Sequence, residues 1–354
     1  MAMTEKERHQ IKLDEIRSRF PHYIQDYVNY MEGRECSPST LLGYLQDFEY
    51  FYHWLFSEGF VTCTLKELPE SFLEKLKLDE VNMFLSHLRL RANFRVASRA
   101  RKISSLKSIF SFLTTKSENA EGECYFYRNV MAKVTIPKSK KTTSKRADKI
   151  SSQILQGDED LKLIEFIEHE YMAKIDKKQK EYYIRDRERD LAILALFLAS
   201  GVRASELTGL NIESLDIENR TISVIRKGDI DEEETVLFRS FACLYLSNYL
   251  EIRTTRYSPS KQEKALFVTV YKGEATRISV RSVQNIVGKY TEQFGKRMSP
   301  HKLRHTLATK MANENKPIVE IMLQLGHSSA STTSLYQNQT LDDRRRSLDE
   351  LDGN

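Results

Sequence analysis

Six side chains in the C-terminal half of the sequence are of the types that attack on a phosphodiester needs. In chain order they are Arg203, Lys227, His301, Arg304, His327 and Tyr336. Arginines are planar, permanently charged donors for phosphate oxygens, histidines and lysines transfer protons, and a tyrosine hydroxyl can act as a nucleophile. Each residue alone has an ordinary structural alternative, such as a helix cap or a core contact. Their combination and order favour phosphodiester chemistry.

Local signals place three of these residues at the ends of helices. A serine–proline pair at 299–300 predicts a helix start, which puts His301 and Arg304 one turn apart on the same face. Another helix is predicted over 317–325, because a proline begins it and a glycine follows it. His327 then lies at the C-terminal end of that helix.

The rest of the C-terminal half reads as helices mixed with short strands. Helices are predicted over 161–171 and 187–200, and the second ends just before Arg203. β-rich runs predict short strands over 221–225, 235–238 and 266–271. Lys227 lies in the polar segment between the first two strands, a predicted hairpin. This pattern indicates an α+β domain of helices with a small antiparallel sheet.

The 354-residue chain has an ordinary globular composition, with 40% apolar and 30% charged residues and a net charge of +5. Its mean hydropathy is −0.51. At about 100–200 residues per domain, this length predicts two domains. No apolar run approaches the ~20 residues of a membrane span, and no secretory signal is visible. The four cysteines form no Cys-x-x-Cys pair, which argues against a zinc finger and predicts reduced thiols in the cytoplasm.

The N-terminal part is predicted to be helical over 13–115. A serine–proline pair at 37–38 begins one helix, whose apolar residues recur at spacings of four, three and four. Further helices are predicted over 79–90 and 97–113. The predicted organisation is an all-α domain over 14–132, a basic linker over 133–150 and a mainly α domain over 151–354.

Positive charge is concentrated around the predicted linker. Between residues 91 and 149 there are 15 Lys/Arg against 4 Asp/Glu. This excess favours a polyanion partner such as a sugar–phosphate backbone, although a solvated, lysine-rich linker has the same composition. The candidate DNA contacts are Arg99, Arg101, Lys107, Lys138, Lys140, Lys141, Lys145 and Arg146.

The six-residue set resembles the tyrosine recombinase (integrase) family, in which Arg, Lys, His-x-x-Arg, His or Trp, and Tyr occur in this order. The family's catalytic positions correspond here to Arg203, Lys227, His301, Arg304, His327 and Tyr336. The similarity spans nearly all of the second domain, and the first domain and linker resemble the family's SAM-like core-binding domain. Within the family, the sequence is most similar to the Xer recombinases that resolve chromosome dimers, in particular the single-recombinase XerS group.

The resemblance implies breakage and rejoining of DNA without ATP, metal or another cofactor. Tyr336 would attack a scissile phosphate, forming a 3′-phosphotyrosine and releasing a 5′-hydroxyl, which conserves the phosphodiester energy. Arg203 and Arg304 would hold the charge that develops on the non-bridging oxygens.

The other members of the set have proton-transfer and hydrogen-bonding roles by the same resemblance. His301 and His327 would donate hydrogen bonds, and His301 would also assist deprotonation of the tyrosine, whose ordinary pKa is about 10. Lys227 would protonate the departing 5′-oxygen. Glu206 is expected to orient a neighbouring base rather than to take part in the chemistry.

The resemblance also implies partners. The protein would bind double-stranded DNA and act as a homotetramer on two duplexes, with pairs of protomers cutting in turn through a Holliday junction. It implies a cytoplasmic setting and control by the FtsK DNA translocase, with no membrane or small-molecule substrate. A terminal segment over 342–351, with Leu341, Leu348 and Leu351, could dock on a neighbouring protomer, although a frayed charged tail is the alternative.

Three rival functions differ from this interpretation in testable ways. A type IB topoisomerase would use the same residues as a monomer. A phage or transposon integrase commonly has an arm-binding domain first, whereas about a dozen residues precede the first predicted helix here. A non-catalytic DNA-binding protein would be expected to lack parts of the set.

Two segments depart from the family pattern. The hairpin carries five carboxylates over 229–234, where the family's turn is usually basic. Because DNA would repel them, this tip is predicted to face solvent or a protein partner. The charged segment 171–185 is longer than usual, and its composition suggests no role.

Overall fold

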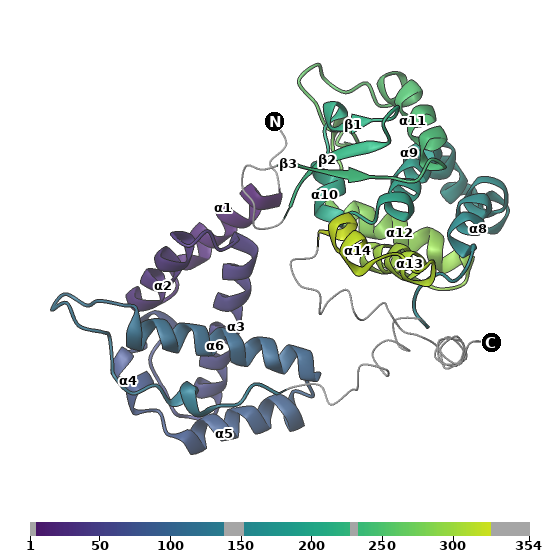
Figure 1. The fold of residues 1–354 in the computed structure, drawn as a ribbon. Coiled ribbons are helices and arrows are strands. Elements are labelled where there is room, and N and C mark those ends of the chain that lie inside the picture. Colours follow the sequence, from purple (N-terminus) through teal and green to yellow (C-terminus); the bar gives the residue numbers. More distant parts are fainter. Residues whose placement is uncertain (1–4, 138–151, 227–232, 327–354) are drawn as a thin grey trace, which may run out of the picture. The chain divides into compact units, whose positions relative to one another are not determined.

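The computed structural model describes residues 5–137, 152–226 and 233–326. The chain divides into two compact units, Met1–Lys140 (unit 1) and Lys141–Asn354 (unit 2) (Figure 1). The described part of unit 1 is helical, and unit 2 is mainly helical with small antiparallel sheets, so the predicted fold class is confirmed. Across the described ranges, no helix is long and apolar enough to cross a membrane.

Unit 1 is built from amphipathic helices around an aromatic core. Its helices are α1 (Glu5–Arg17), α2 (His22–Glu32), α3 (Pro38–Ser57), α4 (Glu70–Lys75), α5 (Leu78–Ser86) and α6 (Val96–Thr115). As predicted, α3 begins after the N-cap Ser37. Phe51 and Trp54 of α3 pack against Phe84 of α5, with ring centroids 4.9 and 5.1 Å apart. Such aromatic pairs bury large apolar areas and hold the two helices together.

Unit 2 surrounds one central helix. Its helices are α8 (Glu159–Glu165), α9 (Lys177–Ser200), α10 (Ala204–Gly209), α11 (Ala242–Tyr257), α12 (Val280–Phe294), α13 (Pro300–Asn313) and α14 (Ile318–Leu325). The last turns of α9, from Leu191 to Ser200, are buried on every side. This explains why that part of the sequence is apolar without a polar face.

The central helix starts earlier than predicted, at Lys177 rather than at Arg187. A capping box sets this start: Gln179 N donates to Asp176 Oδ1 at 2.8 Å, and Asp176 N donates to Gln179 Oε1 at 3.2 Å. Much of the charged segment 171–185 is therefore the first turns of α9. Apolar periodicity missed these turns because their residues are largely exposed.

Unit 2 has two small sheets where the sequence predicted one. The strands β1 (Leu215–Asp216), β2 (Thr221–Ile225) and β3 (Glu233–Leu237) form an antiparallel sheet in that order, which confirms the predicted hairpin. The strands β4 (Val268–Tyr271) and β5 (Glu274–Arg277) form a separate pair. Lys272 and Gly273, both at positive φ, make the tight turn that closes this second hairpin locally.

A buried cluster of charges fixes α9 to α12. Asp190 is fully buried and accepts hydrogen bonds from Arg189 Nη2 at 2.7 Å, Lys289 Nζ at 3.0 Å and Tyr290 Oη at 2.9 Å. Burial alone would raise the pKa of Asp190, but Arg189 and Lys289 hold it below its usual value. Paired charges therefore cross-link α9 and α12.

Candidate active site

Arg203 lies at the start of α10, directly after the turn that ends α9. Gly201 takes a φ of +69° in this turn, and a Cβ there would come within 2.9–3.0 Å of leucine side chains on α13 and α14. The turn can therefore pack closely only without a side chain. Arg203 Nη1 donates to Glu206 Oε1 at 2.6 Å, and Nη2 donates to the Gly326 carbonyl at 2.9 Å. A third of the Arg203 side chain remains exposed.

Arg304 and His301 lie one turn apart on α13, which begins after Ser299 as predicted. Arg304 is only 2% exposed. Its Nη1 donates to the Gly201 carbonyl at 2.6 Å, and its Nη2 donates to the Leu325 carbonyl. One buried guanidinium thus joins the end of α9 to the end of α14.

These cations meet at the C-terminal end of α14. The carbonyls there have no partner within the helix and carry the negative end of its dipole, so they attract arginines. Gly326 ends the helix in the left-handed conformation at φ +58°, as predicted. Its neighbour His327 lies outside the described residues. The structure therefore brings Arg203, His301 and Arg304 together from α10 and α13, beside the residue that precedes His327.

The surroundings of His301 lower the pKa of its imidazole. Partial burial lowers the pKa of this imidazole below its ordinary value of 6.5, and the Arg304 and Arg203 guanidinium groups lower it further. Its ring lies against that of His305, with centroids 4.2 Å apart. At pH 7 His301 is therefore predominantly neutral and can accept a proton.

We expect the Arg203→Gln substitution to raise the pKa of His301 towards 6.5, because it removes one of the two nearby positive charges. An NMR titration of the His301 Cε1–H signal measures this. Arg256→Gln, which removes an arginine paired with Glu188 on α9, should leave the titration unchanged. Equal shifts in both variants would contradict the assignment.

Sequence reasoning missed a residue that the structure places in this cluster. Arg226 follows β2 and is 5% exposed. Its Nη1 lies 3.3 Å from Glu206 Oε2. The Glu206 carboxylate binds the guanidinium groups of Arg203 and Arg226, and its orientation of a neighbouring base stays a prediction. The sequence motif assigns a role only to the adjacent lysine, and no local pattern distinguishes a buried arginine from an exposed one.

The remaining predicted catalytic residues, Lys227, His327 and Tyr336, lie outside the described residues. So do five of the candidate DNA contacts, namely Lys138, Lys140, Lys141, Lys145 and Arg146, and the acidic tip over 229–232. Of the hairpin's acidic residues that are described, Glu234 accepts a hydrogen bond from Arg226 Nε at 2.8 Å. That carboxylate is therefore neutralised within the protein.

Three candidate DNA contacts lie on α6, and two already have internal partners. Arg101 Nη2 donates to Asp47 Oδ1 at 2.7 Å, although half of its side chain is exposed. Lys107 Nζ donates to the Val134 carbonyl at 2.5 Å and so fixes the segment after α6. The Nε of Arg99 is buried and has no partner among the described residues. DNA binding by these three side chains remains a prediction.

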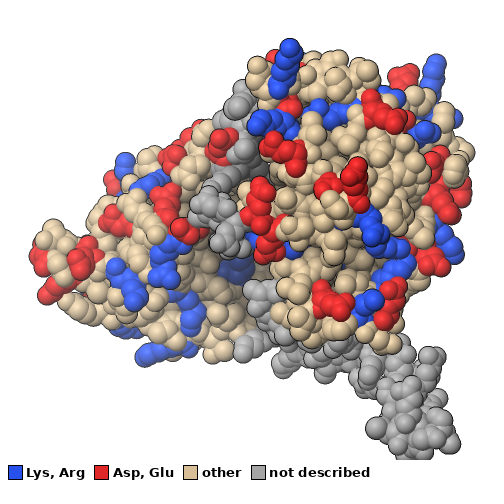
Figure 2. Space-filling model, turned by 45° about the horizontal axis from the view of Figure 1, so that its top comes forward, with Lys and Arg blue, Asp and Glu red and all other residues tan. Residues whose placement is uncertain are grey.

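One face of the molecule carries charges of both signs. On the face drawn in Figure 2, Lys and Arg side chains are interspersed with Asp and Glu side chains. Part of the excess positive charge predicted between residues 91 and 149 is also offset within the fold, because the buried Asp47 pairs with both Arg101 and Lys102.

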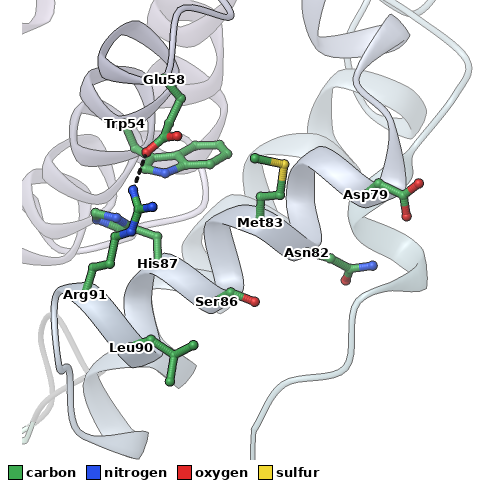
Figure 3. Close-up of a pocket in the computed structure, with 9 residues that line it drawn as sticks. All are labelled: Trp54, Glu58, Asp79, Asn82, Met83, Ser86, His87, Leu90 and Arg91. Atoms are coloured by element: carbon green, nitrogen blue, oxygen red, sulfur yellow. Dashed lines mark hydrogen bonds and ion pairs between the residues drawn. The ribbon is translucent and has the colours of Figure 1, made fainter.

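Unit 1 also has a surface pocket of about 390 Å³ between α3, α5 and the π-helical turn His87–Arg91 (Figure 3). Trp54 forms its inner wall, and Met83 and Leu90 are exposed at its rim. The arginine that lines it, Arg91, is paired with Glu58 at 3.1 Å. Two carboxylates in the lining, Glu58 and Asp79, together with the pairing of Arg91, do not favour phosphate binding at this pocket.

Family comparisons agree with the two-part fold and define the class of the DNA-breaking and rejoining tyrosine recombinases. Residues 165–342 match the Phage integrase family, and residues 24–117 match its N-terminal SAM-like domain. The chain belongs to this family and is a site-specific tyrosine recombinase of the Xer type. The predicted resemblance is thereby confirmed.

Curated relatives include the tyrosine recombinase XerS of Streptococcus agalactiae, which is 39% identical over 96% of this chain and 98% of its own length. The XerS of Streptococcus thermophilus is 37% identical over the same shares. The crystal structure of XerH bound to difH substrate has a TM-score of 0.63 at 21% identity, covering 88% of this chain and 80% of that one. The Tn1549 transposon integrase with circular intermediate DNA has a TM-score of 0.61 at 18% identity, covering 93% and 99%.

Proposed function

We propose that this recombinase converts chromosome dimers to monomers at cell division, by exchange between two copies of one DNA site. The support is its similarity to XerS proteins over 96% of the chain, since the Xer group is the part of the family that resolves dimers. The observation that carries the chemistry is the convergence of Arg203 and Arg304 beside the residue that precedes His327.

In the proposed reaction, the phenolic oxygen of Tyr336 forms a bond to the scissile phosphorus while the bond from phosphorus to the 5′-oxygen breaks. The tyrosine proton passes to a base, for which the neutral His301 is suited. Lys227 gives a proton to the departing 5′-oxygen, and His327 donates a hydrogen bond to the phosphate. Arg203 and Arg304 hold the negative charge that grows on the non-bridging oxygens. Rejoining reverses these steps with a new 5′-hydroxyl.

The proposed partners are a DNA duplex, three further copies of this chain and the FtsK translocase. The XerH and Tn1549 integrase structures contain DNA, which supports the first. The proposed duplex contacts are those of α6 and the linker.

A surface cavity of about 270 Å³ supports the proposed assembly with further copies of this chain. It lies between β3, α13 and α14, and its lining includes Leu237, Leu307 and Met311. We assign it to the terminal segment of a neighbouring copy, which carries Leu341, Leu348 and Leu351.

Leu237→Asp is expected to lower formation of recombinant product by at least about tenfold, because a charge would be buried where the neighbour docks. Cleavage of a single site should change much less. Leu244→Asp on α11 is the matched control, since both leucines are 60% exposed and Leu244 does not line the cavity. Equal recombination by the two variants would argue against this docking site.

The function as a whole is tested with a nicked suicide substrate and a library of genome-derived sites. The nick lets the cut fragment diffuse away, so the covalent complex accumulates and reports the target sequence. Two copies of the recovered site should then yield strand-exchange products. Nicking and resealing without exchange would instead indicate the type IB topoisomerase activity.

A transposon or phage integrase is the second candidate, because the Tn1549 integrase has nearly the same TM-score as XerH. The first candidate is favoured by sequence identity, since the XerS relatives are 36–39% identical to this chain. A site recovered near the chromosome terminus would support dimer resolution, whereas a site at the end of a mobile element would support the integrase.

A further inference from the structure

Arg226 has the environment of a residue that fixes other residues in place. It directly follows β2 and directly precedes Lys227, yet only 5% of it is exposed. Burying a guanidinium is unfavourable unless charges and carbonyls surround it. An apolar side chain would fill the same space without that cost, so the partners of Arg226 indicate what it does.

Its strongest contact closes the base of the β2–β3 hairpin. Arg226 Nε donates to Glu234 Oε2 at 2.8 Å, and Glu234 lies on β3 opposite Val224 of β2. This ion pair joins the two strands at the end where β2 stops, one residue before Lys227 in the sequence. The hairpin base thus has a side-chain link in addition to its backbone ladder.

Its other contacts tie that hairpin to the rest of the cluster. Nη1 lies 3.3 Å from Glu206 Oε2 and 3.3 Å from the Leu325 carbonyl, and Nη2 lies 3.5 Å from the Gln324 carbonyl. Each of these hydrogen bonds is long and individually weak. Together they hold the guanidinium between α10 and the C-terminal end of α14.

Gly326 provides an independent sign of this close approach. A Cβ at this position would lie 2.4 Å from Arg226 Cζ and 2.4 Å from Nε. No side chain can occupy that space while Arg226 is in place. Position 326 therefore requires a glycine for two reasons. Its backbone is left-handed, and the guanidinium of Arg226 occupies the space that a side chain would need.

We propose that Arg226 is a positioning residue for the proton donor Lys227, acting by pinning the hairpin to α10 and α14. This inference rests on the proposed function, in which Lys227 protonates the 5′-oxygen. Arg203 shares Glu206 with Arg226, but its own hydrogen bonds to Glu206 and to the Gly326 carbonyl are shorter, at 2.6–2.9 Å, than the 3.3 Å contact between Arg226 and Glu206. Loss of Arg226 should therefore impair proton donation more than phosphate binding.

The test compares covalent adduct formation on two suicide substrates, one ordinary and one with sulfur in place of the leaving 5′-oxygen. A thiolate departs without an acid, so a defect in proton donation disappears on the sulfur substrate. We expect Arg226→Gln to slow cleavage of the ordinary substrate by about 10- to 100-fold, as displacement of a catalytic group does. On the sulfur substrate it should cleave within about threefold of the parent protein. Arg226→Lys keeps the charge but not the fork of donors. On the ordinary substrate its cleavage rate should therefore lie between the rates of Arg226→Gln and the parent protein.

Two control variants show the two possible outcomes on the sulfur substrate. Lys227→Ala should be rescued by sulfur, and Arg203→Gln, which removes a phosphate ligand, should not. If Lys227→Ala is rescued and Arg226→Gln is equally slow on both substrates, the positioning role is wrong while the proposed function stands. If Lys227→Ala is not rescued, the proton-donor assignment itself fails.

A folding control separates positioning from general loss of structure. Arg253 is 4% exposed and donates to the carbonyls of Leu266, Glu263 and Ala265, so Arg253→Lys removes comparable buried hydrogen bonds elsewhere in unit 2. Its ratio of rates on the two substrates should equal that of the parent protein. A change in that ratio as large as for Arg226→Gln would assign the effect to destabilisation and overturn the proposal.

Discussion

Tyr336→Phe is expected to abolish the covalent protein–DNA adduct while leaving affinity for the DNA site unchanged. The substitution removes one oxygen, the proposed nucleophile, and keeps the ring. Loss of a nucleophile costs on the order of 10⁴-fold or more in rate, because no other group occupies its place. The adduct is measured as the fraction of suicide substrate that stays attached to the protein on a denaturing gel. Binding is measured separately by gel shift.

Tyr271→Phe is the matched control for this variant. Tyr271 lies on β4 and is 66% exposed, so loss of its hydroxyl should affect neither adduct nor binding. Mass spectrometry of the trapped peptide should place the phosphodiester on Tyr336. An adduct that persists in Tyr336→Phe, or one mapped to another residue, would remove the basis of the mechanism.

Arg304→Lys is expected to lower the cleavage rate by about 10²- to 10³-fold, the usual effect of losing one preorganised donor to a developing oxyanion. Arg304 spans from the Gly201 carbonyl to the Leu325 carbonyl, which a single ammonium cannot do in the same geometry. The phosphate would lose a rigid fork of donors. Single-turnover cleavage with saturating protein measures the effect independently of affinity.

Because Arg304 is buried, its substitution also destabilises unit 2, by about 1–3 kcal/mol for the hydrogen bonds involved. Arg253→Lys controls for this, as an arginine of similar burial whose carbonyl partners lie away from the cluster. Its unfolding transition should shift comparably while its cleavage rate stays near that of the parent protein. Comparable loss of cleavage in both variants would mean that Arg304 acts through stability alone.

The helix ends that position Arg203, His301 and Arg304 were predictable because they carry strong local signals. The Ser299–Pro300 start sets the face shared by His301 and Arg304, and the glycine at 326 ends α14 where the sequence predicts. The hairpin and the apolar core of α9 were predictable for the same reason, since periodicity and turn residues act over a few positions. The start of α9 was not, because its exposed first turns lack an apolar stripe.

By itself, the sequence determined which residue types can perform phosphodiester chemistry, their order and the family to which they belong. Only the tertiary structure decided which cations meet: Arg203 and Arg304 converge on the end of α14, and Arg226 lies buried beside them. It also paired Arg101 with Asp47 and gave Glu206 two arginine partners. The physical reason is that burial and charge pairing arise between segments distant in sequence. Nothing in the local sequence marks Arg226 as buried, because the groups that surround it come from α10, α14 and β3.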